Sequence, residues 1–338
     1  MRTRLAVTAA ITAAALLGGG LVASQALAAT PSTPAKARLQ VVGYAEAGST
    51  TAKQLQASSR AVTTVGVDGI NVTSNGSGLT PVAPEALSLL ESAHAQKKKA
   101  ELLVGNFDGA LGDFSPAIGD RLLGSPANIT TVVNRLASEV KAHGWDGVTV
   151  DLESLTPRHP AQLTDLVAKL KWRLGASKSV SICLMATPDD YAAEGYDLEG
   201  LANAADHVVL MAYDQHGPTW TTAGPVGGQP WVASSLAPVL KAVPAGRIQL
   251  GVAGYGYTWP KHGDGVQVSD SGARALAARD HVSPVWDARQ LEWHATLKNG
   301  TVLWWSDAKT YAARTAYAKK LHLGGVAVWS LGLSDPLR

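Results

Sequence analysis

The sequence contains little cysteine and little charge. Among its 338 residues Cys183 is the only cysteine, which excludes a disulfide framework within one chain. Charged residues make up 17% and hydrophobic residues 46%, a composition typical of globular proteins and not of disordered chains. The 29 basic residues nearly balance the 27 acidic ones, and the only basic run is Lys97–Lys99. Because a phosphate-binding surface needs clustered Lys and Arg, we expect no nucleic-acid partner.

Sequence signals for several common kinds of site are also missing. The nine histidines include no pair of the His-Glu-x-x-His kind, so we expect no metal ion and no cofactor. No Gly-x-Gly-x-x-Gly follows the first strand-like run, which removes the usual support for dinucleotide binding. No Gly-x-Ser-x-Gly elbow of a serine hydrolase occurs either.

The amino-terminal segment has the features of an export signal. Two arginines precede an apolar stretch, and Ala26–Ala28 supplies the small residues that a signal peptidase accepts. We expect residues 1–28 to be a cleaved signal peptide and residues 29–37 a linker. The protein would then be secreted, free outside the cell or associated with the cell wall, without stable membrane insertion. A retained anchor is the alternative, because residues 5–23 are nearly long enough to span a bilayer.

Eight short apolar runs separated by helix-like segments predict a parallel sheet built from repeated strand–helix units. The runs are Leu39–Tyr44, Val62–Val67, Ala100–Val104, Gly147–Leu152, Val180–Met185, His207–Met211, Ile248–Val252 and Gly325–Trp329. The helix-like segments include Ala83–Ala95, Asn128–Ala142, Ala161–Leu174, Val232–Val243 and Tyr311–Leu321. We expect a closed (β/α)₈ TIM barrel over residues 38–338, and an open doubly wound sheet is the alternative.

The spacing of the last two runs indicates an insertion. They lie about 70 residues apart, which is far more than one barrel unit needs. We therefore expect a small insertion on the barrel rim, at about residues 260–305, between strands seven and eight.

The fourth run ends in two acids. In TIM barrels the catalytic side chains lie at the carboxyl ends of the strands. Strand alternation places Thr149, Asp151 and Glu153 on one face, which we expect to be the barrel interior. Two carboxylates so close in a partly desolvated mouth cannot both ionise freely, so the pKa of one should rise and let it protonate a leaving group. The alternative is an acidic pair on the rim that is neutralised by a neighbouring Lys or Arg.

Polar and aromatic residues end two further runs. The sixth is followed by Tyr213 and Asp214 after Met211, and the eighth ends in Trp329. Aromatic faces stack on the CH faces of sugar rings, so acids, a Tyr and a Trp in one mouth suggest a carbohydrate site. The 10 Trp against 2 Phe agree with this interpretation, although each aromatic residue alone more often packs in a core.

Four segments together resemble strands four, six, seven and eight of glycoside hydrolase family 18. They are GWDGVTVDLESL at 144–155, LMAYDQHG at 210–217, IQLGVAGYGYTW at 248–259 and GGVAVWSLGLSDP at 324–336. VGNF at 104–107 and VLWWSDAKT at 302–310 are similar to signatures of the bacterial cell-wall branch, which includes spore-cortex-lytic N-acetylglucosaminidases.

The resemblance implies roles for individual residues. Glu153 aligns with the family's proton donor, Asp151 with the acid that turns toward the substrate's acetamido group, and Tyr213 with a hydrogen-bond donor to that group. Trp329 would form the floor of the same subsite. The other residues at positions that line this subsite in the family are Asp214, Met211, Tyr255, Tyr44 and Asn106.

One position departs from the family's strand-four pattern, Asp-x-x-Asp-x-Asp-x-Glu. Here the pattern is Asp146, Thr149, Asp151 and Glu153, so a hydroxyl replaces the second acid. Because Thr149 can only hydrogen-bond Asp151, we expect Asp151 to remain more nearly ionised before substrate binds. The cell-wall branch tends to carry a neutral residue here, so the change is compatible with catalysis.

These features together predict a secreted, monomeric, retaining glycosidase. The resemblance implies cleavage of β-1,4 bonds at N-acetylglucosamine units of chitin or peptidoglycan, with the substrate's acetamido group as nucleophile. A non-catalytic glycan-binding barrel is the main alternative, supported by the missing acid at Thr149. A third hypothesis is a barrel hydrolase that uses a carboxylate nucleophile on sugars without an acetamido group.

Overall fold

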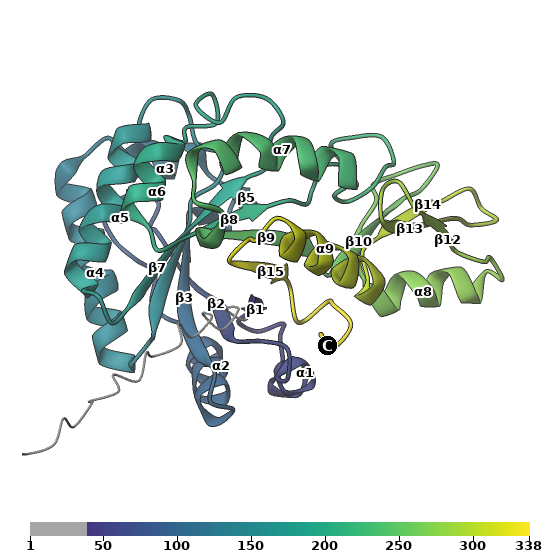
Figure 1. The fold of residues 1–338 in the computed structure, drawn as a ribbon, viewed down its shortest axis with the longest axis horizontal. Coiled ribbons are helices and arrows are strands. Elements are labelled where there is room, and N and C mark those ends of the chain that lie inside the picture. Colours follow the sequence, from purple (N-terminus) through teal and green to yellow (C-terminus); the bar gives the residue numbers. More distant parts are fainter. Residues whose placement is uncertain (1–38) are drawn as a thin grey trace, which may run out of the picture. The chain divides into compact units, whose positions relative to one another are not determined.

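The computed structural model describes residues 39–338, and the predicted signal peptide and linker lie outside them. Eight parallel strands close into a barrel in the order β1-β15-β9-β8-β7-β6-β3-β2, with helices around it (Figure 1). This confirms the predicted (β/α)₈ barrel and excludes the open doubly wound sheet. Within the described residues, no helix is both long and apolar enough to cross a membrane.

The predicted runs match the barrel strands closely. The strands are β1 Gln40–Glu46, β2 Thr64–Asn71, β3 Lys99–Gly105, β6 Gly147–Asp151, β7 Ser179–Met185, β8 His207–Met211, β9 Ile248–Ala253 and β15 Gly325–Trp329. The surrounding helices are α1 Ala52–Ser58, α2 Pro84–Ala95, α3 Pro116–Leu123, α4 Pro126–His143, α5 Pro160–Leu174, α6 Leu198–Ala204, α7 Gln229–Ala242 and α9 Ala308–Lys320.

Three of these helices, α1, α3 and α6, were not singled out by the sequence pattern. Each has only seven or eight residues, too few for a helical period to repeat clearly. Side-chain caps define their starts instead. The hydroxyls of Thr51 and Ser115 and the carboxylate of Asp197 accept hydrogen bonds from backbone N–H groups in the first turns.

Helix α4 directly precedes β6, the strand that carries Asp151. It begins with the cap Ser125 and a proline in its first turn, and its buried stripe repeats at helical spacing up to Val140. Gly144 follows in the left-handed conformation with φ of 80°, and its N–H donates to the Val140 carbonyl. The fully buried Trp145 then leads into β6, so the chain turns back at a defined point before the strand that carries Asp151.

Strand alternation divides the buried residues into two layers. On β1, Val41 and Ala45 pack outward with the helices, while Val42 and Tyr44 face the barrel interior. The outer layer is mainly apolar, whereas the interior also holds the buried polar residues Glu101, Thr149, Asp151 and Ser181.

Between β9 and β15 the chain forms a separate five-stranded sheet, which Figure 1 shows with α8 beside it. Its elements are β10 Tyr255–Trp259, β11 Gln267–Ser269, α8 Asp270–Arg279, β12 Val285–Asp287, β13 Glu292–Thr296 and β14 Val302–Trp305. The sheet starts at Tyr255, five residues before the expected Pro260, because Gly254 separates β9 from β10 within one apolar segment.

Candidate active site

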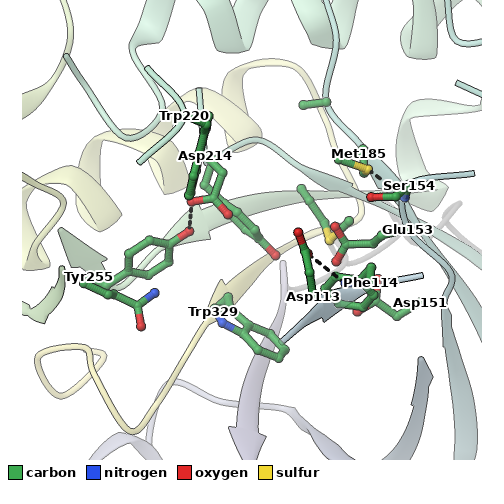
Figure 2. A pocket seen from close by; sticks show the side chains of 14 residues that line it. Asp113, Phe114, Asp151, Glu153, Ser154, Met185, Asp214, Trp220, Tyr255 and Trp329 are labelled. Carbon is green, nitrogen blue, oxygen red and sulfur yellow. Dashed lines mark hydrogen bonds between the residues drawn. The ribbon is translucent and has the colours of Figure 1, made fainter. Parts of the chain in front are cut away.

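A cavity of about 370 Å³ opens at the carboxyl ends of the barrel strands. Seven of the nine residues predicted for the site line it, namely Asp151, Glu153, Met211, Tyr213, Asp214, Tyr255 and Trp329. The remaining lining residues are Asp113, Phe114, Ser154, Met185, Ala186, Trp220 and Gln267. Figure 2 shows the labelled side chains of Asp151, Glu153, Asp214 and Trp329 around one space. Among residues 39–338, the lining contains four carboxylates and no Lys, Arg or His.

Asn106 holds the backbone of Glu153 from behind the cavity. Its side-chain amide donates to the Glu153 carbonyl, and its Oδ1 accepts from the Glu153 N–H, both at 2.9 Å. Asn106 itself is fully buried and is not among the lining residues, so it contacts the site through Glu153. This reciprocal pair of bonds sets where the chain leaves β6 and therefore where the Glu153 carboxylate lies.

The surroundings of the Glu153 carboxyl favour its protonated form. Burial raises its pKa well above the ordinary value, and the nearby carboxylates of Asp151, Asp214 and Asp113 raise it further. A protonated carboxylic acid can donate its proton to a leaving group. The direction of the pKa shift therefore suits the role predicted for Glu153.

Asp151 has a different environment from the one expected. Its pKa is raised to about 7 by burial and then by the Asp68 carboxylate, and a hydrogen bond with Cys183 opposes the rise. Thr149 does not hydrogen-bond Asp151, because its hydroxyl donates 2.9 Å to Glu101 Oε2 on β3. The expectation that Thr149 keeps Asp151 ionised is therefore wrong, since Thr149 lies one layer deeper and binds another acid.

The chain turns sharply after β8 and presents Asp214 to two tyrosines. Asp214 has a φ of 61°, and its Oδ1 accepts hydrogen bonds from Tyr255 at 2.5 Å and Tyr257 at 2.8 Å. Burial raises the pKa of Asp214, and these two hydrogen bonds lower it. The Tyr213 ring packs edge-on to Tyr255, with 6.2 Å between ring centroids. Asp214 is thus fixed as an acceptor, and the buried Tyr213 hydroxyl remains protonated because burial raises its pKa.

Tyr44 lies beneath the cavity and does not line it. Its ring lies against Gly66, where an added Cβ would be 2.4 Å from the ring carbons. The ring centroid is 5.6 Å from that of Trp329, and the hydroxyl is 3.8 Å from Cys183 Sγ. Tyr44 therefore supports Trp329 from below.

Loops bring aromatic and acidic residues to the cavity that the pattern of strand ends did not predict. Asp113 and Phe114 come from the hairpin of β4 Phe107–Asp108 and β5 Asp113–Phe114, and Trp220 comes from the loop after β8. The chain's only two phenylalanines pack edge-on in this hairpin, with 5.7 Å between centroids, and this concentration was an available signal. The Trp220 side chain is 56% exposed and offered no signal.

No group of three or more His, Cys, Asp or Glu residues within 39–338 is arranged to hold a metal ion. The side chains that line the cavity supply a carboxyl whose surroundings favour its protonated form, a second carboxyl with a pKa of about 7, phenols and an indole. Acid–base chemistry on a ring-shaped substrate fits this set.

Comparison with known proteins identifies the family. Residues 40–333 match Glycosyl hydrolases family 18. The chain is 25% identical over 252 residues to the uncharacterized glycosylase YvbX of Bacillus subtilis, covering 71% of this chain and 73% of YvbX. It is 26% identical over 278 residues to the cortical fragment-lytic enzyme of the same species, covering 76% of this chain but only 62% of that enzyme.

A solved structure agrees with these sequence matches. The crystal structure of a chitinase from Chromobacterium violaceum superposes with a TM-score of 0.77 and 26% identity, covering 88% of this chain and 95% of that one. The resemblance found in the four sequence segments is thereby confirmed. The protein belongs to glycosyl hydrolase family 18 and is a glycosidase.

Proposed function

We propose that the protein is a secreted, retaining glycosidase that cleaves β-1,4 bonds at N-acetylglucosamine units of chitin or peptidoglycan, with Glu153 as proton donor. The observation that carries this proposal is the pair of buried acids with raised pKa values, Asp151 and Glu153, in the cavity that Tyr213 and Trp329 also line.

In the proposed reaction the substrate supplies its own nucleophile. The 2-acetamido oxygen attacks the anomeric carbon while Glu153 transfers its proton to the departing glycosidic oxygen. Glu153, now ionised, removes a proton from the water that opens the oxazolinium intermediate. Because each step inverts the anomeric carbon, the product retains the starting configuration.

The neighbouring residues would orient and stabilise the acetamido group. Ionised Asp151 accepts from the acetamido N–H and stabilises the positive charge that develops there. The protonated Tyr213 hydroxyl donates to the acetamido oxygen and holds it in line with the anomeric carbon. Trp329 forms the floor under the sugar ring, and Met211, Asp214 and Tyr255 form its walls.

The relatives leave both glycans open as substrates. The name of the cortical fragment-lytic enzyme refers to spore cortex, and the Chromobacterium protein is a chitinase. Secretion rests on the predicted signal peptide at residues 1–28. Mass spectrometry of products from chitin oligomers and from purified peptidoglycan distinguishes the substrates, because only peptidoglycan yields muropeptides.

The decisive experiment replaces the proposed proton donor. Glu153→Gln should lower kcat/KM on a fluorogenic chitobioside by at least about a hundredfold, because a missing general acid costs about that much. Glu139→Gln, on the exposed side of α4, removes a partly exposed glutamate and should leave activity unchanged. Proton NMR of the first product should show the retained β anomer.

Two outcomes would contradict the proposal. Near wild-type turnover by Glu153→Gln would exclude Glu153 as the acid. Binding of chitooligosaccharides by calorimetry without any turnover in the wild type would instead identify a glycan-binding barrel.

A further inference from the structure

The acid that is missing from strand four leaves Asp151 without a partner on its own strand. The Thr149 hydroxyl is directed to Glu101 Oε2, which also accepts a hydrogen bond from Ser181 at 3.2 Å. Asp151 Oδ1 is buried and has no hydrogen-bond partner among residues 39–338. A buried carboxylate oxygen without a donor is costly unless the group is protonated or another acid shares its proton.

A carboxylate from another strand lies at the height of Asp151. Asp68 on β2 is in register with Leu103 on β3, and Leu103 is in register with Thr149 on β6. Because the strands are tilted, residues at equal height shift by about one residue per strand, and alternate strands share a layer. Asp68 is therefore level with Asp151, two residues beyond Thr149, as Glu101 on β3 is with Ser181 on β7, which donates a hydrogen bond to it.

The side chain of Asp68 points to the barrel interior. Its neighbours Val65 and Val67 pack in the outer core, so alternation turns Gly66 and Asp68 inward. The absence of a side chain at Gly66 leaves room for the Tyr44 ring directly below Asp68. Asp68 is partly buried and faces the interior, but it is not among the residues that line the cavity.

We propose that Asp68 replaces, from β2, the second acid of the family's strand-four pattern and is the partner carboxyl with which Asp151 shares a proton in the empty cleft. This inference rests on the proposed role of Asp151 in binding the acetamido group. Asp68 acts through Asp151 and is therefore a positioning residue, which keeps the buried pair near one negative charge and sets the pH at which Asp151 becomes ionised.

The electrostatics of the cluster agree with this arrangement. Burial and the Glu46 carboxylate on β1 raise the pKa of Asp68 to about 6. Asp68 in turn contributes, after burial, to the rise of the Asp151 pKa to about 7. Within residues 39–338 no Lys, Arg or His forms an ion pair with either carboxylate, so each is neutralised mainly by protonation.

The other titratable groups around Asp151 carry no positive charge that would favour its ionised form. They are Glu153 after β6, Cys183 on β7, Tyr44 on β1 and Tyr213 after β8. Burial raises the pKa of each of these groups, which favours their neutral forms. Asp68 is therefore the group whose charge changes together with that of Asp151 in the neutral range.

The pH profile of Asp68→Asn tests the proposal. Ionised Asp151 and protonated Glu153 form the active state, so the acid limb of kcat/KM follows the pKa of Asp151. Removing the Asp68 charge lowers that pKa, and the limb should move about one unit to lower pH, with about tenfold higher kcat/KM at pH 5. A loss of activity that is equal at every pH would indicate a merely structural role and overturn the proposal.

Two further variants control the experiment. Glu46→Gln removes a carboxylate that faces Asp68 but does not act directly on the pKa of Asp151. The acid limb of the kcat/KM profile of this variant should therefore move by less than about a third of the shift in Asp68→Asn. Thr149→Asp in the Asp68→Asn background returns an acid to the family position and should move the limb back to higher pH. If the acid limb of the Asp68→Asn profile lay within about 0.3 pH unit of the wild-type limb, the pairing of Asp68 with Asp151 would be refuted.

A readout without turnover separates this inference from the proposed function. Carbon-13 NMR of labelled Asp carboxyl groups follows Asp151 in Glu153→Gln, with and without Asp68→Asn. The Asp151 resonance should titrate at lower pH when Asp68 is absent, and an unchanged midpoint would refute the pairing. If the wild type lacked glycosidase activity, the proposed function would fail while this titration still decided whether the two acids are coupled.

Discussion

Glu153 and Glu292 are both buried glutamates, but their surroundings differ. The Glu292 carboxylate accepts hydrogen bonds from the N–H groups of Val226 at 2.7 Å and Gly227 at 2.8 Å. Burial raises its pKa to about 7, while Arg314 and these two bonds lower it. Glu292 thereby ties the inserted sheet to the loop after β8 with groups that favour its ionised form.

At Glu153 every neighbouring charge disfavours ionisation. Burial and the carboxylates of Asp151, Asp214 and Asp113 all raise its pKa, and no Lys, Arg or His of the described part of the chain lines the cavity. The comparison shows that burial alone does not mark a functional acid in this barrel. An acid that holds the fold together is surrounded by donors, whereas the proposed catalytic acid is surrounded by other acids.

The largest expected effect is that replacing Glu153 lowers activity, whereas replacing Glu292 lowers stability. Glu153→Gln should lose activity at least about a hundredfold but keep the free energy of unfolding within about 0.5 kcal/mol, because the surroundings already favour a neutral group there. Glu292→Gln should keep kcat/KM within about threefold but lose about 1–3 kcal/mol, because one of the two backbone N–H groups that it binds would face an amide NH₂ instead of a carboxylate oxygen. Urea denaturation and kinetics on both variants check this. Equal destabilisation of the two would remove the distinction.

The second prediction concerns the pH dependence of stability. The folded pKa of Asp151, about 7, lies above the ordinary value of 3.8 for this group, so its contribution to stability is full below about pH 4 and is lost as the pH rises through 7. The free energy of unfolding should therefore fall less between pH 4 and pH 8 in Asp151→Asn than in the wild type. The difference between the two falls should be on the order of 2 kcal/mol. Urea denaturation at the two pH values measures this, and parallel losses would contradict it.

A third prediction tests the support under Trp329. Gly66→Ala places a Cβ 2.4 Å from the Tyr44 ring, so it should cost about 1–3 kcal/mol and lower kcat by displacing Tyr44. Gly246→Ala is the matched control, since its Cβ meets no atom within 4 Å. Thermal unfolding and kinetics of the pair test the prediction. A Gly66→Ala variant that behaves like the control would show that Tyr44 can move freely.

The smallest expected effect concerns the outermost acid. Asp113→Asn removes a negative charge that raises the pKa of Glu153, so the alkaline limb of kcat/KM should move to lower pH, by about 0.3 unit. Asp108→Asn changes the same hairpin without being a cause of the Glu153 pKa and should leave the limb in place. A shift to higher pH in Asp113→Asn would contradict the assigned sign.

The pattern of apolar runs in the sequence predicted the barrel strands accurately. The bounds of β8 and β15 coincide with the predicted runs, because a buried parallel strand is a continuous apolar run that ends where polar side chains begin. The same rule brought Asp151, Glu153, Tyr213 and Trp329 together, since the carboxyl ends of all barrel strands meet at one mouth. The short helices and the β4–β5 hairpin were not predicted, because they are too short for a helical or strand period to repeat clearly.

The sequence by itself thus determined the barrel, the strand ends and the main residues of the cavity. Only the tertiary structure decided which groups act on them: Glu101 receives the Thr149 hydroxyl, the Asp68 carboxylate raises the pKa of Asp151, and Asn106 binds the Glu153 backbone from behind. The physical reason is that alternation gives each side chain a face along its own strand, whereas contacts across the barrel depend on the register between strands. That register is formed only when the barrel closes.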